Sequence, residues 1–144
     1  MTTAAQILEG KGHAVWSVAP DAFVYEALKL MAEKNVGALV VLEGDELKGI
    51  FSERDYARKV ILAGKSSREI TVEEIMSPAV ITVRPQQSVD ECMALMTDKR
   101  IRHLPVLEGG RLVGVISIGD AVKAIISERE FTIEQLQSYI RGSG

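Results

Sequence analysis

The sequence predicts a mixed α/β (α+β) fold of two pseudo-symmetric halves, each ordered strand–helix–strand–strand–helix and packed together as one globule. Residues 15–62 align with residues 80–127 without a gap at an offset of 65, and 18 of the 48 aligned pairs are identical. Within each half, apolar residues at helical spacing precede two apolar runs that are joined by a glycine-containing turn. Internal repetition of this kind decides the architecture before any other feature does.

The composition is that of a folded protein. The chain has 144 residues, of which 47% are hydrophobic and 26% charged, so we expect a core and little disorder. The net charge of −3 gives no general attraction to nucleic acid or to anionic membranes. No apolar run approaches the ~20 residues that a membrane-spanning helix needs. We therefore expect neither a nucleic-acid partner nor a membrane partner.

Each half begins with a short extended piece, VWSV or VITV, and continues into a helix. The predicted helices cover Phe23–Lys34 and Ser88–Lys99. Their apolar positions recur at helical spacing. These positions are Val24, Ala27, Leu28, Leu30 and Met31 in the first half and Val89, Cys92, Met93, Leu95 and Met96 in the second. Cys92 and the methionines are therefore expected to pack in the core.

Two strands follow each helix and form a predicted hairpin. The sequences are ALVVL–EGDE–LKGIF and HLPVL–EGGR–LVGVI, and glycine in both turns accepts a positive φ at little cost. The second strand of each hairpin runs into Ser52–Asp55 or Ser117–Asp120, where a further helix begins. The segment Phe131–Arg141 is predicted as one more short amphipathic helix before the final Gly-Ser-Gly.

The repeat extends upstream with one adjustment. Thr3–Leu8 resembles Thr71–Met76 at an offset of 68, so the first half carries three extra residues in its Glu9–His13 connection. Neither half, at ~60 residues, could bury much apolar surface alone, which favours packing of the two copies face to face. The predicted organisation is 1–70 for the first repeat with its N-terminal helix, 71–130 for the second, and 131–144 for the C-terminal helix and tail.

The pattern Gly-x-x-Ser-x-x-Asp closes both hairpins, as GIFSERD from Gly49 to Asp55 and GVISIGD from Gly114 to Asp120. This duplicated motif, with HLPV in a first strand, resembles a pair of CBS domains, the tandem called a Bateman module. The resemblance covers about residues 3–130. It implies a regulatory effector containing adenosine, namely AMP, ADP, ATP, S-adenosylmethionine or NAD, held in the cleft between the halves.

The resemblance also implies roles for individual residues. The motif aspartates, Asp55 and Asp120, would hold the ribose hydroxyls, and Ser52 and Ser117 would contact phosphate. The other half would complete each adenine pocket. For the Asp120 site the implied residues are Gly12, His13, Val15, Trp16, Gly37 and Ala38; for the Asp55 site they are Ser77, Val80, Ile81, Arg102 and His103.

Physical chemistry supports these roles but leaves alternatives. A carboxylate at a helix start can accept two hydrogen bonds from the cis hydroxyls of ribose, and the helix N-terminus favours phosphate. An aspartate there can equally cap its helix, and a lone Ser-x-x-Asp would favour the cap. The duplication, with glycine retained in both copies, favours the ligand role, and both roles can hold together.

The two sites are not equivalent in sequence. Arg54 in the first motif stands where Gly119 stands in the second. Arg54 and Arg58 could pair with phosphate, or they could belong to a solvated basic helix face, and the sequence favours neither. His103 could contact the ligand or serve the structure, and its position in the resemblance favours the ligand.

The extra segment Gly10–His13 lacks the order of a nucleotide-hydrolysing P-loop. Its Gly-Lys-Gly is expected to be a surface turn. The resemblance places this segment beside the nucleotide of the Asp120 site, so a second hypothesis is that the longer loop admits a dinucleotide such as NAD there, with Trp16 as a flat apolar wall.

The sequence therefore predicts a stand-alone adenine-nucleotide sensor without a catalytic cofactor, a metal site or an enzyme activity. Its output would be an unknown protein partner or a change of oligomer, and we expect a homodimer to which 131–141 contributes. The lack of a signal-peptide pattern and the single cysteine predict a cytoplasmic location. The alternatives are a structural dimerisation module without a ligand, an enzyme, and, most distantly, a nucleic-acid binder.

Overall fold

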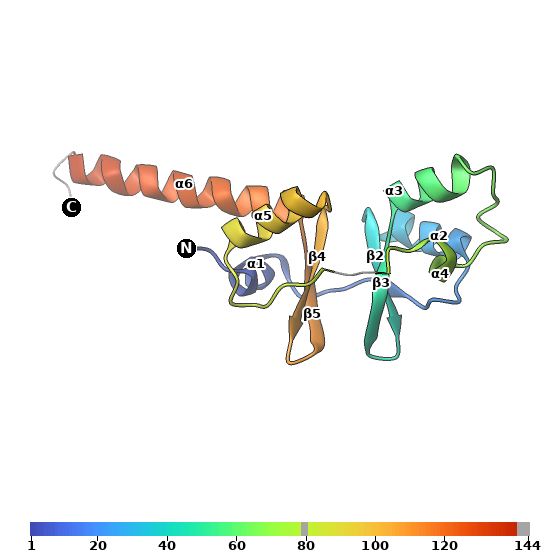
Figure 1. The fold of residues 1–144 in the computed structure, drawn as a ribbon. Helices are drawn as coiled ribbons and strands as arrows, with labels where there is room; N and C mark the ends of the chain where they lie inside the picture. The colour runs from blue at the N-terminus through green and yellow to red at the C-terminus, as the bar shows by residue number, and fades with distance from the viewer. Residues whose placement is uncertain (79–80, 141–144) are drawn as a thin grey trace. The chain divides into compact units, whose positions relative to one another are not determined.

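The structure is a computed structural model that describes residues 1–78 and 81–140, and it divides into two compact units. The repeat-1 unit consists of Ala14–Ile81 with Gly109–Leu112, and the repeat-2 unit consists of Met1–His13, Thr82–Glu108 and Val113–Gly144. Both units mix helices with strands, which confirms the predicted fold class. Figure 1 shows the elements of each unit.

The repeat-1 unit contains a three-stranded sheet in the order β1-β2-β3. Its strands are β1 (Ser17–Val18), β2 (Ala38–Glu43) and β3 (Glu46–Ser52). β1 runs parallel to β2, and β2 and β3 form the predicted antiparallel hairpin. The helices of this unit are α2 (Val24–Lys34), α3 (Glu53–Tyr56), the π-helical turn η1 (Ala57–Ile61) and α4 (Val72–Ile75).

The repeat-2 unit repeats this arrangement with a shorter sheet. It contains α1 (Ala4–Lys11), α5 (Val89–Lys99), β4 (His103–Glu108), β5 (Arg111–Ser117) and α6 (Ile118–Ile140). β4 and β5 form the second predicted hairpin. The extended piece VITV contributes a single parallel bridge between Val83 and Val106, whereas Val80 lies outside the described residues.

The short N-terminal helices of the two repeats are exchanged between the units. α1 precedes the first repeat in sequence but packs in the repeat-2 unit, where the amide of Ala4 donates to the Gln87 carbonyl at 2.8 Å. α4 precedes the second repeat but packs in the repeat-1 unit, where the amide of Val72 donates to the Ala22 carbonyl at 2.8 Å. The two bonds are equivalent in the repeat, because Ala4 aligns with Val72 and Gln87 aligns with Ala22. The compact units therefore cross the boundary at 70/71 that the repetition marks in the sequence.

The exchanged segments explain the glycine of each motif. A Cβ on Gly49 would lie 2.6 Å from the Ser77 carbonyl oxygen and 2.9 Å from the Met76 sulfur. A Cβ on Gly114 would lie 2.5 Å from Cδ2 of Leu8. Leu8 and Met76 are equivalent in the repeat, so both glycines leave room for the same position of the exchanged segment.

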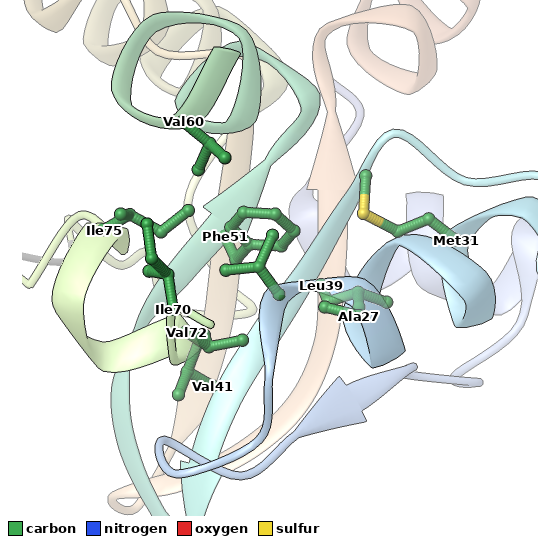
Figure 2. Close-up of a cluster of buried hydrophobic side chains, with 10 residues drawn as sticks. Ala27, Met31, Leu39, Val41, Phe51, Val60, Ile70, Val72 and Ile75 are labelled. Atoms are coloured by element: carbon green, nitrogen blue, oxygen red, sulfur yellow. The ribbon is translucent and has the colours of Figure 1, made fainter. Parts of the chain in front are cut away.

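The core of the repeat-1 unit gathers between its sheet and helices. Phe51 on β3 is fully buried, and Figure 2 shows its ring among side chains from α2, η1 and α4. Met31 belongs to the same cluster. In the repeat-2 unit, Cys92 and Met96 are buried at the corresponding helix face. The prediction that Cys92 packs in a core is confirmed.

The C-terminal segment differs from the sequence prediction. α6 is one continuous helix from Ile118 to Ile140, and no separate helix starts at Phe131. Beyond Gly119 in its first turn, α6 contains neither glycine nor proline, so nothing in the sequence breaks it. α6 extends past α1 and α5 (Figure 1), and every residue from Arg129 to Ile140 is exposed. Arg141 lies outside the described residues.

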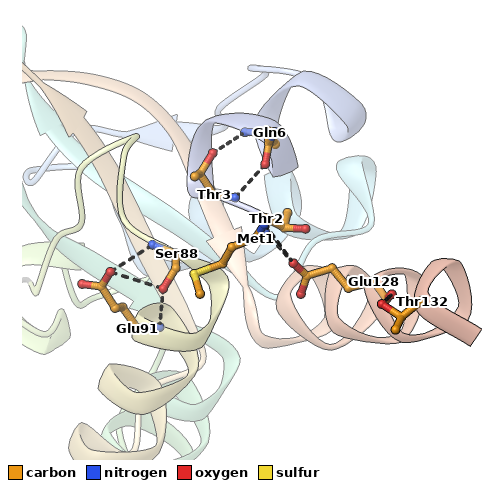
Figure 3. A network of polar contacts seen from close by, with 8 residues as sticks. All are labelled: Met1, Thr2, Thr3, Gln6, Ser88, Glu91, Glu128 and Thr132. Atoms are coloured by element: carbon orange, nitrogen blue, oxygen red, sulfur yellow. Dashed lines mark hydrogen bonds and ion pairs between the residues drawn. The ribbon is translucent and has the colours of Figure 1, made fainter. Parts of the chain in front are cut away.

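Polar contacts fix the first residues of the chain within the repeat-2 unit. The Thr2 amide donates to Glu128 of α6 at 2.6 Å, and Thr3 and Gln6 form a capping box at the start of α1 (Figure 3). Ser88 and Glu91 form the same box at the start of α5. Within residues 1–78 and 81–140, no helix has the length and apolar character needed to cross a membrane.

Candidate functional site

Asp55 lies where β3 ends and α3 begins, and it forms a capping box with Ser52. Its Oδ2 accepts hydrogen bonds from the Ser52 amide and the Ser52 hydroxyl, both at 3.0 Å, and its own amide donates to Ser52 Oγ at 3.2 Å. The residue is 9% exposed. Ser52 is therefore the N-cap of α3, and Asp55, at the third position of the helix, completes the box.

The second carboxylate oxygen of Asp55 faces the exchanged segment. Oδ1 accepts from the Ser77 hydroxyl at 3.4 Å and lies 3.4 Å from Nζ of Lys59. The same ammonium donates to the Ile75 carbonyl at 3.0 Å. Ser77, predicted to belong to the Asp55 site, is therefore brought to Asp55, and Lys59 joins it there.

Asp120 occupies the equivalent position between β5 and α6. Its Oδ2 accepts from the Ser117 amide at 2.8 Å, and its amide donates to Ser117 Oγ at 3.1 Å. Oδ2 also accepts from Nζ of Lys11 at 2.6 Å, while the same ammonium donates to the Val115 carbonyl at 2.8 Å. A lysine therefore reaches each motif aspartate.

The electrostatics keep Asp120 ionised. Burial raises the pKa of this carboxyl, but the hydrogen bonds from Lys11 and Ser117 and the charge of Lys11 outweigh burial and leave the pKa below its ordinary value. At neutral pH the residue is a carboxylate, which is the form that accepts hydrogen bonds from hydroxyl groups.

The prediction of a surface turn at Gly10–Gly12 is wrong. Lys11 ends α1 and pairs with Asp120, and Gly12 stops the helix in the left-handed region at φ 99°. His13 follows, with Nδ1 2.8 Å from the Val113 carbonyl oxygen. A neutral imidazole at that distance must carry its proton on Nδ1, because a carbonyl can only accept. The structure thus brings Gly12 and His13 into the unit that holds Asp120.

Two other pairs of predicted site residues, Gly37-Ala38 and Arg102-His103, each lie beside the Ser-x-x-Asp motif of their own repeat. Ala38 is the register partner of Ser52, and the Gly37 carbonyl accepts from the Glu53 amide at 3.1 Å. In the repeat-2 unit, the Arg102 carbonyl accepts from the Ile118 amide at 2.8 Å, and His103 begins β4. The assignment of each pair to the opposite motif stays a prediction.

Four of the remaining predicted residues, Val15, Trp16, Arg54 and Ile81, belong to the repeat-1 unit. Val15 and Ile81 are half-buried there. The indole of Trp16 has Nζ of Lys34 4.5 Å above its ring centroid, a cation–π contact. Arg54 is the second residue of α3, and its predicted contact with phosphate stays a prediction. Val80 lies outside the described residues.

An open hollow of about 360 Å³ lies beside the start of β2. It is lined by Leu28, Met31, Ala32, Asn35, Val36, Gly37 and Glu53. In the part of the chain that the structure describes, no three His, Cys, Asp or Glu side chains gather as metal ligands would.

Lys11 and Lys59 are the site residues that sequence reasoning missed. Lys59 follows Asp55 by four residues, a spacing that places oppositely charged side chains side by side on a helix, so a signal for it existed. Lys11 is 109 residues away from Asp120 in sequence. The resemblance places the segment Gly10–His13 beside the Asp120 site, but no local spacing singles out Lys11 as the partner of Asp120.

The comparison with protein families decides the classification. The model of the CBS domain matches twice, at residues 12–61 and 72–127. The chain belongs to the CBS-domain family. The two matches follow the two repeats, and each contains one complete Ser-x-x-Asp motif.

Relatives of this CBS protein cover nearly its whole length. The mitochondrial CBS domain-containing protein CBSX3 of Arabidopsis thaliana is 42% identical over 98% of this chain and 73% of its own. A solved structure of a protein with CBS domains from Burkholderia ambifaria MC40-6 is 57% identical, with a TM-score of 0.85, over 88% of this chain and 95% of its own.

Two further solved structures bear on ligand and assembly. The CBS domain pair of protein MJ0100, in complex with 5′-methylthioadenosine and S-adenosyl-L-methionine, is 26% identical with a TM-score of 0.76, over 86% of this chain and 99% of its own. A hexameric CBS-CP12 protein from bloom-forming cyanobacteria is 29% identical with a TM-score of 0.75, over 100% of this chain and 89% of its own.

Proposed function

We propose that this CBS protein is a regulatory module that binds an adenosine-containing ligand through Asp55 and Asp120. The observation that carries the proposal is the duplicated box: in both units a carboxylate stands at the junction of a strand and a helix, held by a serine three residues earlier. A carboxylate so placed matches the two hydroxyls of ribose, and the adjacent helix N-terminus favours phosphate.

The adenosyl complex of the MJ0100 domain pair supports this ligand class. Within this class of adenosine-containing ligands, the effectors that we propose are AMP, ADP, ATP and NAD. The module binds them without chemical turnover. Ligand binding would favour one conformation or assembly, which a partner protein then reads. A cytoplasmic location also remains part of the proposal.

One observation favours a second candidate, a structural module without a ligand. Both aspartates already complete capping boxes with the serines that precede them, and both pair with lysines. These interactions account for the carboxylates without any effector, so a binding measurement has to decide between the two candidates.

Replacing the motif carboxylates by amides is expected to remove ligand binding one site at a time. Asp55→Asn and Asp120→Asn keep the size of the side chain but lose the charge that strengthens hydrogen bonds from ribose hydroxyls, so each should weaken binding at its own site by about 10- to 100-fold. Calorimetric titration with AMP, ADP, ATP, S-adenosylmethionine and NAD measures this effect.

Glu91→Gln provides the matched control, because Glu91 forms the same kind of box with Ser88 at the start of α5 but lies outside both motifs. The affinity of the Glu91→Gln variant for each of the five ligands should equal that of the unaltered protein. If folded protein gives no saturable heat with any of the five ligands, the structural module becomes the better account.

We also propose that the protein self-associates through α6. Val122, Ile126, Ile133, Leu136 and Ile140 form an exposed apolar seam with the three- and four-residue spacing of paired helices. An unpartnered helix as exposed as the last turns of α6 is only marginally stable in water, so a second copy that covers the seam would stabilise it.

The seam contains Arg129. In a parallel pair of α6 helices this residue would face its own copy, and like charges would meet. An antiparallel pair separates the two arginines, which favours that orientation. The proposed assembly is therefore a homodimer with antiparallel α6 helices.

Leu136→Glu should shift the protein from dimer to monomer, because in the antiparallel pair it places a charge against the apolar Ile126 of the second copy. Sedimentation equilibrium measures the molecular mass. Gln135→Glu adds the same charge on another face of α6 and should leave the mass unchanged. A monomeric unaltered protein, or a Leu136→Glu variant that keeps the dimer mass, would refute the interface.

A further inference from the structure

Lysines reach both motif aspartates, but from positions that the repeat does not relate. Lys59 stands four residues after Asp55, and the residue equivalent to Lys59 in the second repeat is Ala124. Lys11 comes instead from the exchanged helix α1, in the segment where the first repeat has extra residues. Duplication of an ancestral half therefore does not account for the two lysines.

The two lysines nevertheless make the same kind of contact, although Lys11 lies 2.6 Å from Oδ2 of Asp120 and Lys59 lies 3.4 Å from Oδ1 of Asp55. Each ammonium bridges one carboxylate oxygen and one backbone carbonyl: Lys59 bridges Asp55 and Ile75, and Lys11 bridges Asp120 and Val115. Half-exposed ion pairs of this kind contribute little to stability. Since two residues unrelated by the repeat both place an ammonium beside a motif carboxylate, the shared contact points to a requirement of the site and not of the fold.

We propose that Lys11 and Lys59 are specificity-determining residues that make the two sites select phosphorylated adenosine ligands over uncharged ones. This inference rests on the proposed function, because it assumes that ribose binds at the aspartates. The ligand class it names is adenosine carrying one or more 5′-phosphates, with AMP as the smallest member.

The physical reason is charge compensation. A ribose held by a carboxylate places its 5′-phosphate one sugar ring away, well inside the roughly 8 Å over which charges interact at physiological ionic strength. An uncompensated aspartate would repel that phosphate. An ammonium beside the carboxylate cancels this repulsion, and it has three N–H donors, of which two are used by the aspartate and the carbonyl.

Ligand and lysine can share the carboxylate at Asp120. The hydrogen bonds from Lys11 and from the Ser117 amide both end on Oδ2, so a ribose hydroxyl can approach through Oδ1 while Lys11 stays in place. The opposite possibility is that each lysine blocks its aspartate. Removal of the lysine would then strengthen the binding of every adenosyl ligand, charged or not.

The test compares AMP with adenosine, which share base and ribose and differ in the phosphate. Lys11→Gln is made in the Asp55→Asn background, so that the titration measures binding at the Asp120 site. Lys59→Gln is made in the Asp120→Asn background, so that the titration measures binding at the Asp55 site. Calorimetric titration should show AMP binding about tenfold weaker in each lysine variant, the loss expected for one charge-assisted contact. Adenosine binding should change by less than about twofold, since it lacks that contact.

Lys99→Gln and Lys48→Gln are matched controls, because each removes one lysine charge that pairs with an acidic side chain in the same unit but outside the motifs. Both should keep the preference for AMP. Equal weakening of AMP and adenosine would overturn the inference, and so would tighter adenosine binding in the lysine variants. If the unaltered protein binds neither ligand, the proposed function fails and this inference fails with it, whereas binding with unchanged selectivity refutes the inference alone.

Discussion

Gly49→Ala is expected to destabilise the repeat-1 unit strongly, by about 1–3 kcal/mol or more. The new methyl carbon would lie 2.6 Å from the carbonyl oxygen of Ser77. That carbonyl cannot move away without loss, because it accepts the Ile50 amide at 3.2 Å in the bridge that ties the exchanged segment to β3. The free energy of unfolding from urea titration measures the effect.

Two other glycine-to-alanine variants provide comparisons for the loss of stability in Gly49→Ala. The atoms nearest to a methyl group in Gly114→Ala belong to the side chain of Leu8, which can shift in part, whereas Gly49→Ala meets a backbone carbonyl, so the cost of Gly114→Ala should be smaller. Gly10→Ala meets nothing within 4 Å inside α1 and should be neutral or stabilising by up to ~1 kcal/mol. If Gly49→Ala and Gly10→Ala had the same stability, the exchanged segment would not pack on β3 as described.

Phe51→Ala should be the most destabilising single truncation in the repeat-1 unit, at about 3–5 kcal/mol. Phe51 is 0% exposed and stands in the cluster where β3 meets α2, η1 and α4 (Figure 2). Its removal leaves a cavity that the surrounding side chains can fill only in part. Urea titration followed by circular dichroism measures the loss.

Phe131→Ala is the matched control, because it makes the same chemical change at a side chain that is 63% exposed on α6. Its effect on the free energy of unfolding should stay within about 0.5 kcal/mol. A Phe51→Ala variant that lost less than 1 kcal/mol would contradict the central place of this side chain in the core.

Local features of the fold could be predicted from the sequence. The apolar spacing predicts α2 and α5 to within one residue of their starts, because caps and periodicity act over a few residues. The turn glycines, Gly44 and Gly109, predict where the two strands of each hairpin are joined. The predicted separate helix at Phe131 is wrong because no glycine or proline stands there to interrupt α6.

The exchange of α1 and α4 could not be predicted from the repeat. Thr3–Leu8 and Thr71–Met76 carry equivalent apolar residues, so either segment fits either unit by local pattern alone. Which unit each segment joins is therefore a property of the tertiary packing and not of the local pattern. The same exchange brings Lys11 to Asp120, which is why this pair escaped sequence reasoning while Lys59, on the same helical turns as Asp55, could have been found.

The most direct test of the central claim is a crystal structure of the protein grown with saturating ATP. We expect the ribose hydroxyl oxygens within about 3.2 Å of the carboxylate of Asp55, of Asp120 or of both, with the phosphates toward the neighbouring lysine. Well-ordered crystals in which ATP binds away from both aspartates, or in which neither motif holds it, would contradict the assignment of these motifs as ribose sites.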